Sequence, residues 1–118
     1  MTGDLIDRLE RLLIDAARER RTMTYAEAAR LLDIEPPHTI HKTALLIEAM
    51  MRRHAAAEAP QLASLVVSKA RGGLPAPGYF ELMGDLGLYD GGARGPEAAR
   101  FHAAEMRRCY EAAARDGD

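Results

Sequence analysis

Two short stretches of the sequence collect side chains that can donate hydrogen bonds to anions or to the edges of bases. They are His38, Thr39, His41 and Lys42 in the first stretch, and Lys69 and Arg71 in the second. The first group falls near the expected start of a helix, whose partial positive charge favours contact with phosphate. We therefore treat these six residues as a candidate surface for double-stranded DNA. Phosphate contacts would position the chain, and the first group would read bases.

The helical patterns on either side of the pair Pro36-Pro37 have the proportions of a helix-turn-helix. Thr24 and Glu27 can form a capping box, because each side chain can accept a hydrogen bond from the other residue's backbone amide. A helix is expected over about residues 25–32, followed by a longer one over about 37–57 that the two prolines can open. In a helix-turn-helix the second helix enters the major groove with its first residues. A plain helical pair with a polar cap fits the same spacing, so both interpretations stay open.

Residues 62–68 form the one stretch with a β-type pattern in an otherwise helical sequence. The β-branched Val66 and Val67 lie in an apolar run that is bounded by a proline and by two glycines. This pattern predicts a short strand that is buried on both sides. It could pair with an extended segment near Thr22-Met23 or near Leu88-Tyr89. If the preceding helices read DNA, this strand and the basic loop after it would form the wing.

The segment Thr24-Tyr25-Ala26-Glu27-Ala28-Ala29 resembles the Thr-Tyr-Gly-x-(Leu/Ile)-Ala segment of the DNA-binding domain of alkylguanine-DNA alkyltransferases and alkyltransferase-like proteins. In that family a recognition helix follows, then a hydrophobic stretch carrying Pro-Cys-His-Arg, then a glycine-rich loop. The order is similar here over about residues 22–80. The family's cysteine and histidine would fall near Ser68 and Lys69, so its reactive motif is absent. The resemblance therefore implies a winged-helix-like DNA-binding fold and no alkyl transfer.

The remaining apolar periodicity predicts three further helices, over about residues 4–21, 79–86 and 96–114. At 118 residues, the chain is long enough for one hydrophobic core and too short for two. We expect a single domain over residues 1–118. Its fold class should be α+β and mostly helical, with a winged-helix-like arrangement and one short β region.

The sequence favours a non-enzymatic protein without a cofactor. Ser68 and Lys69 are adjacent, so on a strand they would point to opposite faces, and no base lies at a suitable spacing for a nucleophile. His38 and His41 could face one metal, but no cysteine or helically spaced glutamate accompanies them. The single Cys109 excludes an intramolecular disulfide. The remaining enzymatic option is a site assembled only by the tertiary fold.

The rival interpretation is a protein-interaction module, such as an adaptor or inhibitor, that binds its partner through the 69–80 loop. Its docking residues would be Leu74, Pro75, Pro77 and Tyr79. A formal net charge of −2 favours this rival, because nucleic-acid coats are usually basic. Of the 16 basic residues only two are lysines, a bias that a GC-rich, bacterial-like genome explains.

No apolar run is long enough to span a membrane, and the amphipathic helices carry mixed charge on their polar faces. The first residues also lack the basic and apolar segments of a secretory signal. We therefore expect no membrane attachment and a cytoplasmic location.

Overall fold

The computed structural model describes residues 2–116, which form helices joined by short extended segments. In chain order the elements are α1 (Thr2–Arg18), β1 (Met23–Thr24), α2 (Tyr25–Leu31), α3 (Thr39–Ala56), the 3-10 helix η1 (Leu62–Leu65), β2 (Val66–Val67), the 3-10 helix η2 (Lys69–Arg71), α4 (Pro77–Asp85) and α5 (Pro96–Asp116). The predicted fold class, α+β and mostly helical with one short β region, is confirmed.

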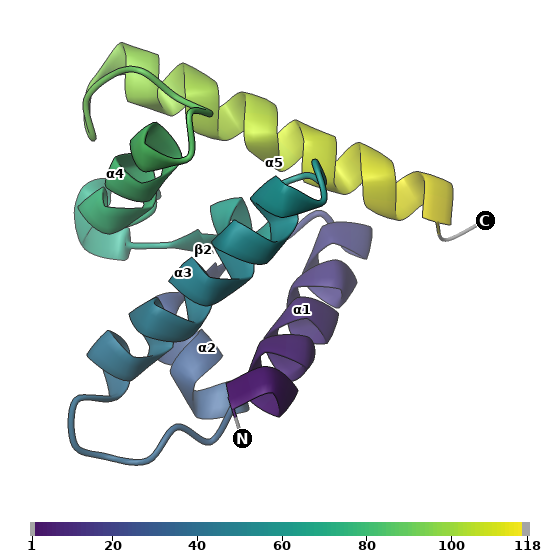
Figure 1. The fold of residues 1–118 in the computed structure, drawn as a ribbon, viewed down its shortest axis with the longest axis vertical. Coiled ribbons are helices and arrows are strands. Elements are labelled where there is room, and N and C mark those ends of the chain that lie inside the picture. Colours follow the sequence, from purple (N-terminus) through teal and green to yellow (C-terminus); the bar gives the residue numbers. More distant parts are fainter. Residues whose placement is uncertain (1, 117–118) are drawn as a thin grey trace.

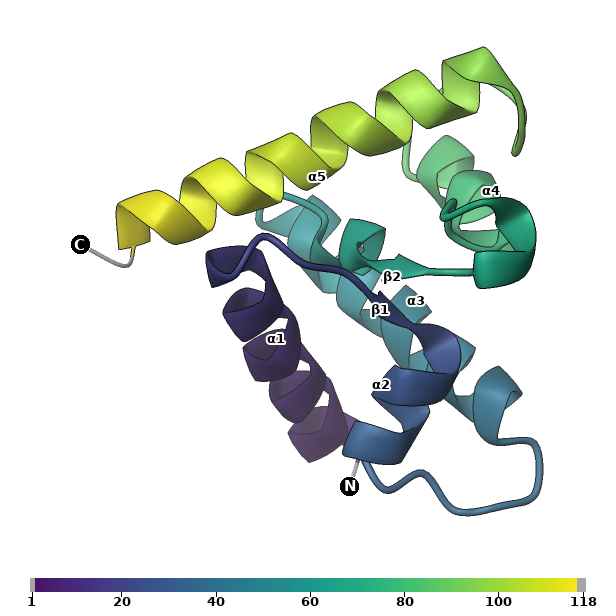
Figure 2. The ribbon, with the colours of Figure 1, turned by 180° about the vertical axis from the view of Figure 1, so that it is seen from behind.

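The helices enclose η1 and the two short strands. Figure 1 shows α1 and α3 side by side, with α5 crossing near one end of both. From behind, in Figure 2, β1 and β2 lie between the lower helices α1 and α2 and the upper helices α4 and α5. Because η1 packs against α1, α3 and α5, it forms the centre of the molecule.

The two strands are parallel and only two residues long. Met23 pairs with Val66 and Thr24 pairs with Val67, so the expected partner near Thr22-Met23 is the correct one. The prediction of a strand over 62–68 is wrong at its start, because Leu62–Leu65 forms a 3-10 helix. A short buried apolar run fits either structure, and periodicity alone does not separate them.

The boundaries of two helices also differ from prediction. The two prolines do not open α3, because His38 follows them in the left-handed region at φ 61° and the helix starts only at Thr39. Helix α1 ends at Arg18 rather than near residue 21, where Arg20 adopts φ 53° and the chain turns towards β1. The positive φ angles of Arg20 and His38 cannot be predicted from their residue types. Residues other than glycine seldom adopt such angles, and do so where the surrounding structure holds them there.

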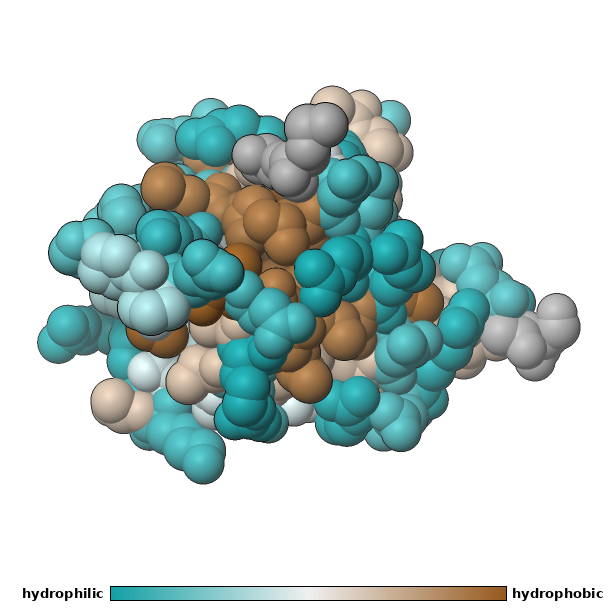
Figure 3. Space-filling view, turned by 90° about the horizontal axis from the view of Figure 1, so that it is seen from below, coloured by the Kyte–Doolittle hydropathy of each residue, from teal (hydrophilic) through white to brown (hydrophobic). Residues whose placement is uncertain are grey.

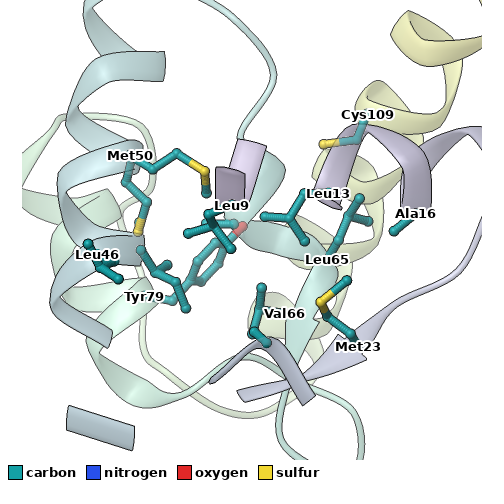
Figure 4. Close-up of a cluster of buried hydrophobic side chains, with 14 of the residues drawn as sticks. Leu9, Leu13, Ala16, Met23, Leu46, Met50, Leu65, Val66, Tyr79 and Cys109 are labelled. Atoms are coloured by element: carbon teal, nitrogen blue, oxygen red, sulfur yellow. The ribbon is translucent and has the colours of Figure 1, made fainter. Parts of the chain in front are cut away.

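The core is built from side chains of every helix around η1 and β2. Figure 4 shows Leu13 of α1 and Leu65 of η1 next to Cys109 of α5, while Leu9 of α1 and Met50 of α3 lie further from Cys109, towards Leu46 and Tyr79. These side chains are all buried. They fix η1 from several sides, and η1 in turn places β2 and the turn after it.

Helix α3 buries one face along most of its length but not at its first turn. Its buried residues are Thr43, Leu46, Ile47, Met50, Met51 and His54. Ile40, an apolar residue in the first turn of the helix, is 49% exposed. Figure 1 shows the reason: the first turn of α3 extends away from α1, so α1 does not cover it. Among the described residues, no helix is both long and apolar enough to cross a membrane.

Candidate functional site

The start of α3 presents the first group of predicted contact residues to solvent. His38 is the residue before the helix, and both His38 and His41 are exposed. Lys42 is also exposed, and its Nζ donates to the Glu35 carbonyl oxygen at 3.0 Å. Thr39 is half-buried, and its carbonyl oxygen accepts from the Thr43 hydroxyl at 2.7 Å. Two imidazoles and one ammonium group therefore remain accessible at this helix N-terminus.

Lys69 lies on the tight turn that follows β2. The Gly73 amide donates to the Ser68 carbonyl oxygen at 3.0 Å, and the Ser68 amide donates to the Leu74 carbonyl oxygen at 2.8 Å. Gly72 ends η2 at φ 67°, a left-handed conformation that glycine adopts without strain. The turn is thus fixed by its own backbone, and it holds the exposed Lys69 at its surface.

Unlike the exposed Lys69, Arg71 is half-buried and bound to other parts of the chain. Its guanidinium donates to the carbonyl oxygens of Pro75 and Ala93 and lies 5.9 Å from the centre of the Phe80 ring. These contacts join the turn to α4 and to the segment before α5. Arg71 is therefore mainly a structural residue, because a phosphate contact would compete with the two carbonyl groups.

Two shallow hollows place Lys69 and the start of α3 on one continuous surface. The first, of about 310 Å³, is lined by Tyr25, Ala26 and Lys69 among others, and the second, of about 370 Å³, by Ala26, Arg30 and Thr39 among others. Because both include Ala26, they join over α2. We call this surface, from Lys69 over Ala26 and Arg30 to Thr39, the contact strip.

The contact strip carries both signs of charge. Arg30 is an exposed cation on it that the sequence analysis did not single out, although its position on the helix before α3 was a usable signal. Asp33 lines one of its hollows, and the carboxylate of Glu27 interacts electrostatically with Arg30 and Lys69. The Thr24 backbone amide donates to the Glu27 carboxylate at 3.1 Å. This hydrogen bond, and a smaller effect of the Thr24 side chain, hold the pKa of Glu27 below its usual value. Glu27 is thus negatively charged at neutral pH, which limits the positive potential of the strip.

Three polar groups inside the core form a separate cluster around η1. The His102 ring donates through Nε2 to the Ser64 carbonyl oxygen at 2.7 Å, and the Ser64 and Tyr79 hydroxyls are 2.5 Å apart. Burial lowers the pKa of His102 and raises that of Tyr79. All three residues are at most 4% exposed, so this serine and histidine are not accessible to a substrate and act as structural groups.

Residue Gln61 is the second point at which α5 is fastened to the centre of the fold. Its backbone amide donates to Glu105 Oε2 at 3.2 Å, and its backbone carbonyl oxygen accepts from Cys109 Sγ at 3.3 Å. Burial raises the pKa of the Cys109 thiol to about 12, so the thiol is protonated and unreactive at neutral pH. Cys109 therefore does not replace the cysteine of the alkyltransferase motif.

The 69–80 loop does not offer the docking residues that the rival interpretation requires. Pro75 is among the fully buried residues and Tyr79 is 4% exposed, so both belong to the core. Leu74 is half-buried, and Pro77 is exposed as the first residue of α4. A partner could reach only part of the predicted set. The loop pattern misled because Pro75 is buried and Tyr79 packs inward against Ser64 of η1 and His102 of α5. The Ala76 backbone amide also fastens the loop to α2, because it donates to Tyr25 Oη at 2.9 Å.

No metal site is formed within residues 2–116, where no three His, Cys, Asp or Glu side chains come together as ligands. His54 and His102 each have another partner: His54 Nε2 lies 2.7 Å from Glu10 Oε1, and His102 donates to Ser64. Compared with known proteins, the chain matches no family model, no curated protein and no solved structure.

One further surface combines apolar side chains with charge. Between the start of α1 and the first turns of α3 there is a hollow of about 610 Å³, and we call its surface the underside patch. Its lining residues are Leu5, Asp33, Ile34, Glu35, Lys42, Leu45 and Leu46. Figure 3, seen from below, shows hydrophobic residues gathered at the centre of this side of the molecule, with hydrophilic residues around them.

Proposed function

We propose that this protein is a non-enzymatic, winged-helix-like DNA-binding protein, with the start of α3 directed towards the major groove. The observation that carries the proposal is the contact strip: Arg30 lines one hollow with Thr39 of α3, and Lys69 lines the neighbouring hollow, which shares Ala26. His38, His41 and Lys42 are exposed at the same helix end. Lys69, Arg30 and Lys42 would contact phosphates, while the imidazoles and Thr39 would reach base edges.

The order of the elements supports this proposal together with the sequence resemblance. A capping box begins α2, a longer helix follows, and β2 leads into a glycine turn, in the order described for the alkyltransferase-like DNA-binding domains. Arg71 would act indirectly, by holding the turn that carries Lys69. The alkyl transfer of that family has no counterpart here. Ser68 and Lys69 stand where the family has its cysteine and histidine, and Cys109 is buried. A DNA partner also makes the cytoplasm the proposed location.

The proposal is tested by titrating labelled duplex DNA with the protein at two salt concentrations. Each phosphate contact contributes about 0.9 to the slope of log affinity against log salt, so three cations predict a slope of roughly −3. Lys69→Ala should weaken binding and reduce the slope by about one. The matched control is Arg107→Ala, an exposed cation on α5, far from α2 in Figure 2, which should leave the slope unchanged.

Two results would overturn the proposal. The first is no binding of duplex DNA even at low salt. The second is an equal loss for Lys69→Ala and Arg107→Ala, because a general charge effect would then replace a contact on the strip.

A second candidate function, protein interaction, is favoured by one observation. Leu45 of α3, which lines the underside patch, is 52% exposed, and Leu5 and Ile34 on the same hollow are half-exposed. Large apolar side chains gathered on one side of a protein indicate an interaction surface. This candidate function therefore uses the underside patch in place of the 69–80 loop.

A further inference from the structure

The underside patch has an apolar floor and a charged rim. Leu5, Ile34 and Leu45 provide exposed or half-exposed apolar surface, and Leu46 closes the hollow from below. Leu45 is 52% exposed although it lies in the middle of α3, where neighbouring turns contribute to the core. Covering these side chains would remove apolar surface from water, which is favourable in proportion to the area covered.

The rim of the patch contains both signs of charge close together. Asp33 and Glu35 lie on the segment between α2 and α3, and Lys42 lies one turn into α3, and all three are exposed. The Lys42 ammonium is 3.0 Å from the backbone carbonyl oxygen of Glu35, so the positive and negative groups border the same hollow. A rim of one sign would repel a second copy of itself, whereas this rim can attract one.

We propose that the underside patch binds a second copy of this chain in a two-fold symmetric dimer. In such an interface the same patch is used twice, so residue i of one copy meets residue j of the other and the reverse. Lys42 of each copy then faces Asp33 or Glu35 of its partner, while Leu45 and Ile34 of both copies close the apolar centre. The inference rests on the second candidate function. Lys42 is shared with the proposed DNA contacts, so the dimer is tested by self-association in the absence of DNA.

Sedimentation velocity over a concentration series tests the dimer. The wild-type chain should change from one copy to two as its concentration rises. Leu45→Glu places a charge in the apolar centre and should stay at one copy throughout. Leu88→Glu is the matched control, because Leu88 is 46% exposed after α4, away from the patch, and this variant should self-associate like the wild type. Since both leucines are half exposed, neither change removes a core side chain.

A charge exchange makes the test specific for two-fold symmetry. Lys42→Glu alone and Glu35→Lys alone should each weaken self-association, because like charges then face each other across the interface. A mixture of the two variants should form a heterodimer, since both cross-interface pairs regain opposite signs. High salt should partly weaken this heterodimer, because salt screens exposed ion pairs.

Three outcomes would overturn the dimer. They are a wild-type chain that stays at one copy at every concentration, a Leu45→Glu variant that associates like the wild type, and a mixture that associates no better than its components. A single-copy wild type with intact DNA titration would reject the dimer and keep the first proposed function. A wild-type chain that dimerises but does not bind DNA would keep the dimer and reject the first proposed function.

Discussion

Ser64 and Tyr79 show how two hydroxyl groups specify the packing at the centre of the fold. Their oxygens are 2.5 Å apart in a site that excludes solvent, and the Ser64 backbone oxygen also accepts from His102. A buried polar group without a partner is costly, while a paired one is nearly neutral. The pair therefore favours the one arrangement in which η1, α4 and α5 bring these three residues together.

Removing both hydroxyls of this pair should destabilise the protein by less than the sum of the two single removals. Tyr79→Phe or Ser64→Ala leaves one buried hydroxyl without its partner, at a cost of about 1–3 kcal/mol. The double variant should cost less than the sum of the two single changes, because no unpaired hydroxyl remains. Urea denaturation of the four proteins measures this coupling, and strictly additive losses would show that the hydroxyls do not depend on each other.

At the scale of elements, α2 depends on its first turn. The helix has only seven residues, and isolated helices of this length are unstable in water. Its capping box is complete: the Glu27 amide donates to Thr24 Oγ1 at 3.1 Å, and the Thr24 amide donates to the Glu27 carboxylate at 3.1 Å. Because α2 forms the middle of the contact strip, this local motif also positions Arg30.

The capping box should give the stability of the protein a measurable pH dependence. Thr24→Ala should cost about 1 kcal/mol. The folded-state pKa of Glu27 is lowered from 4.5, chiefly by its hydrogen bond with the Thr24 backbone. Its carboxylate therefore stabilises the fold above pH 4.5, and this contribution is lost as the pH falls through the lowered value.

Denaturation of wild type and Glu27→Ala at neutral and at acidic pH measures this contribution. The difference in unfolding free energy between the two proteins should shrink in acid. Glu111→Ala on α5 is the control at an exposed glutamate, and it should show no such change. A difference for Glu27→Ala that is the same at both pH values would show that the charge of Glu27 is not what stabilises α2.

The sequence predicts those elements whose signals are local. The capping box and the apolar stripes of α1 and α5 depend on residues within a few positions of each other, and these helices are present. The start of η1 was missed because Leu62–Leu65 is shaped by distant partners, including Glu105, which binds the amide of the preceding Gln61.

The same distinction explains the predicted site. Exposure of His38, His41, Lys42 and Lys69 follows from short polar segments, and the structure leaves all four accessible. The role of Arg71 depends on a carbonyl group 22 residues away along the chain, which no local pattern reveals. Contacts of this kind require the tertiary fold.

At the scale of the whole molecule, α5 closes the fold over η1. His102, Glu105 and Cys109 lie on one face of this helix, at spacings of three and four residues. They bind Ser64 and Gln61, which belong to or directly precede η1. Because η1 also packs on α1 and α3, the last helix joins the first part of the chain to the centre. Loss of α5 contacts should accordingly coincide with unfolding of the entire protein.

The Cys109 thiol can report this coupling directly. It is 1% exposed and its pKa is raised to about 12 by burial, so a thiol reagent should modify it only when the fold opens. Met83→Ala on α4 removes a fully buried side chain and should cost about 2–5 kcal/mol, which corresponds to at least roughly 30-fold faster modification if the molecule opens as one unit. Leu88→Ala, an exposed site just after the same helix, is the control and should leave the rate nearly unchanged. If Met83→Ala lowers the stability without accelerating modification of Cys109, then α4 opens separately from α5, and η1 does not couple the two halves of the fold.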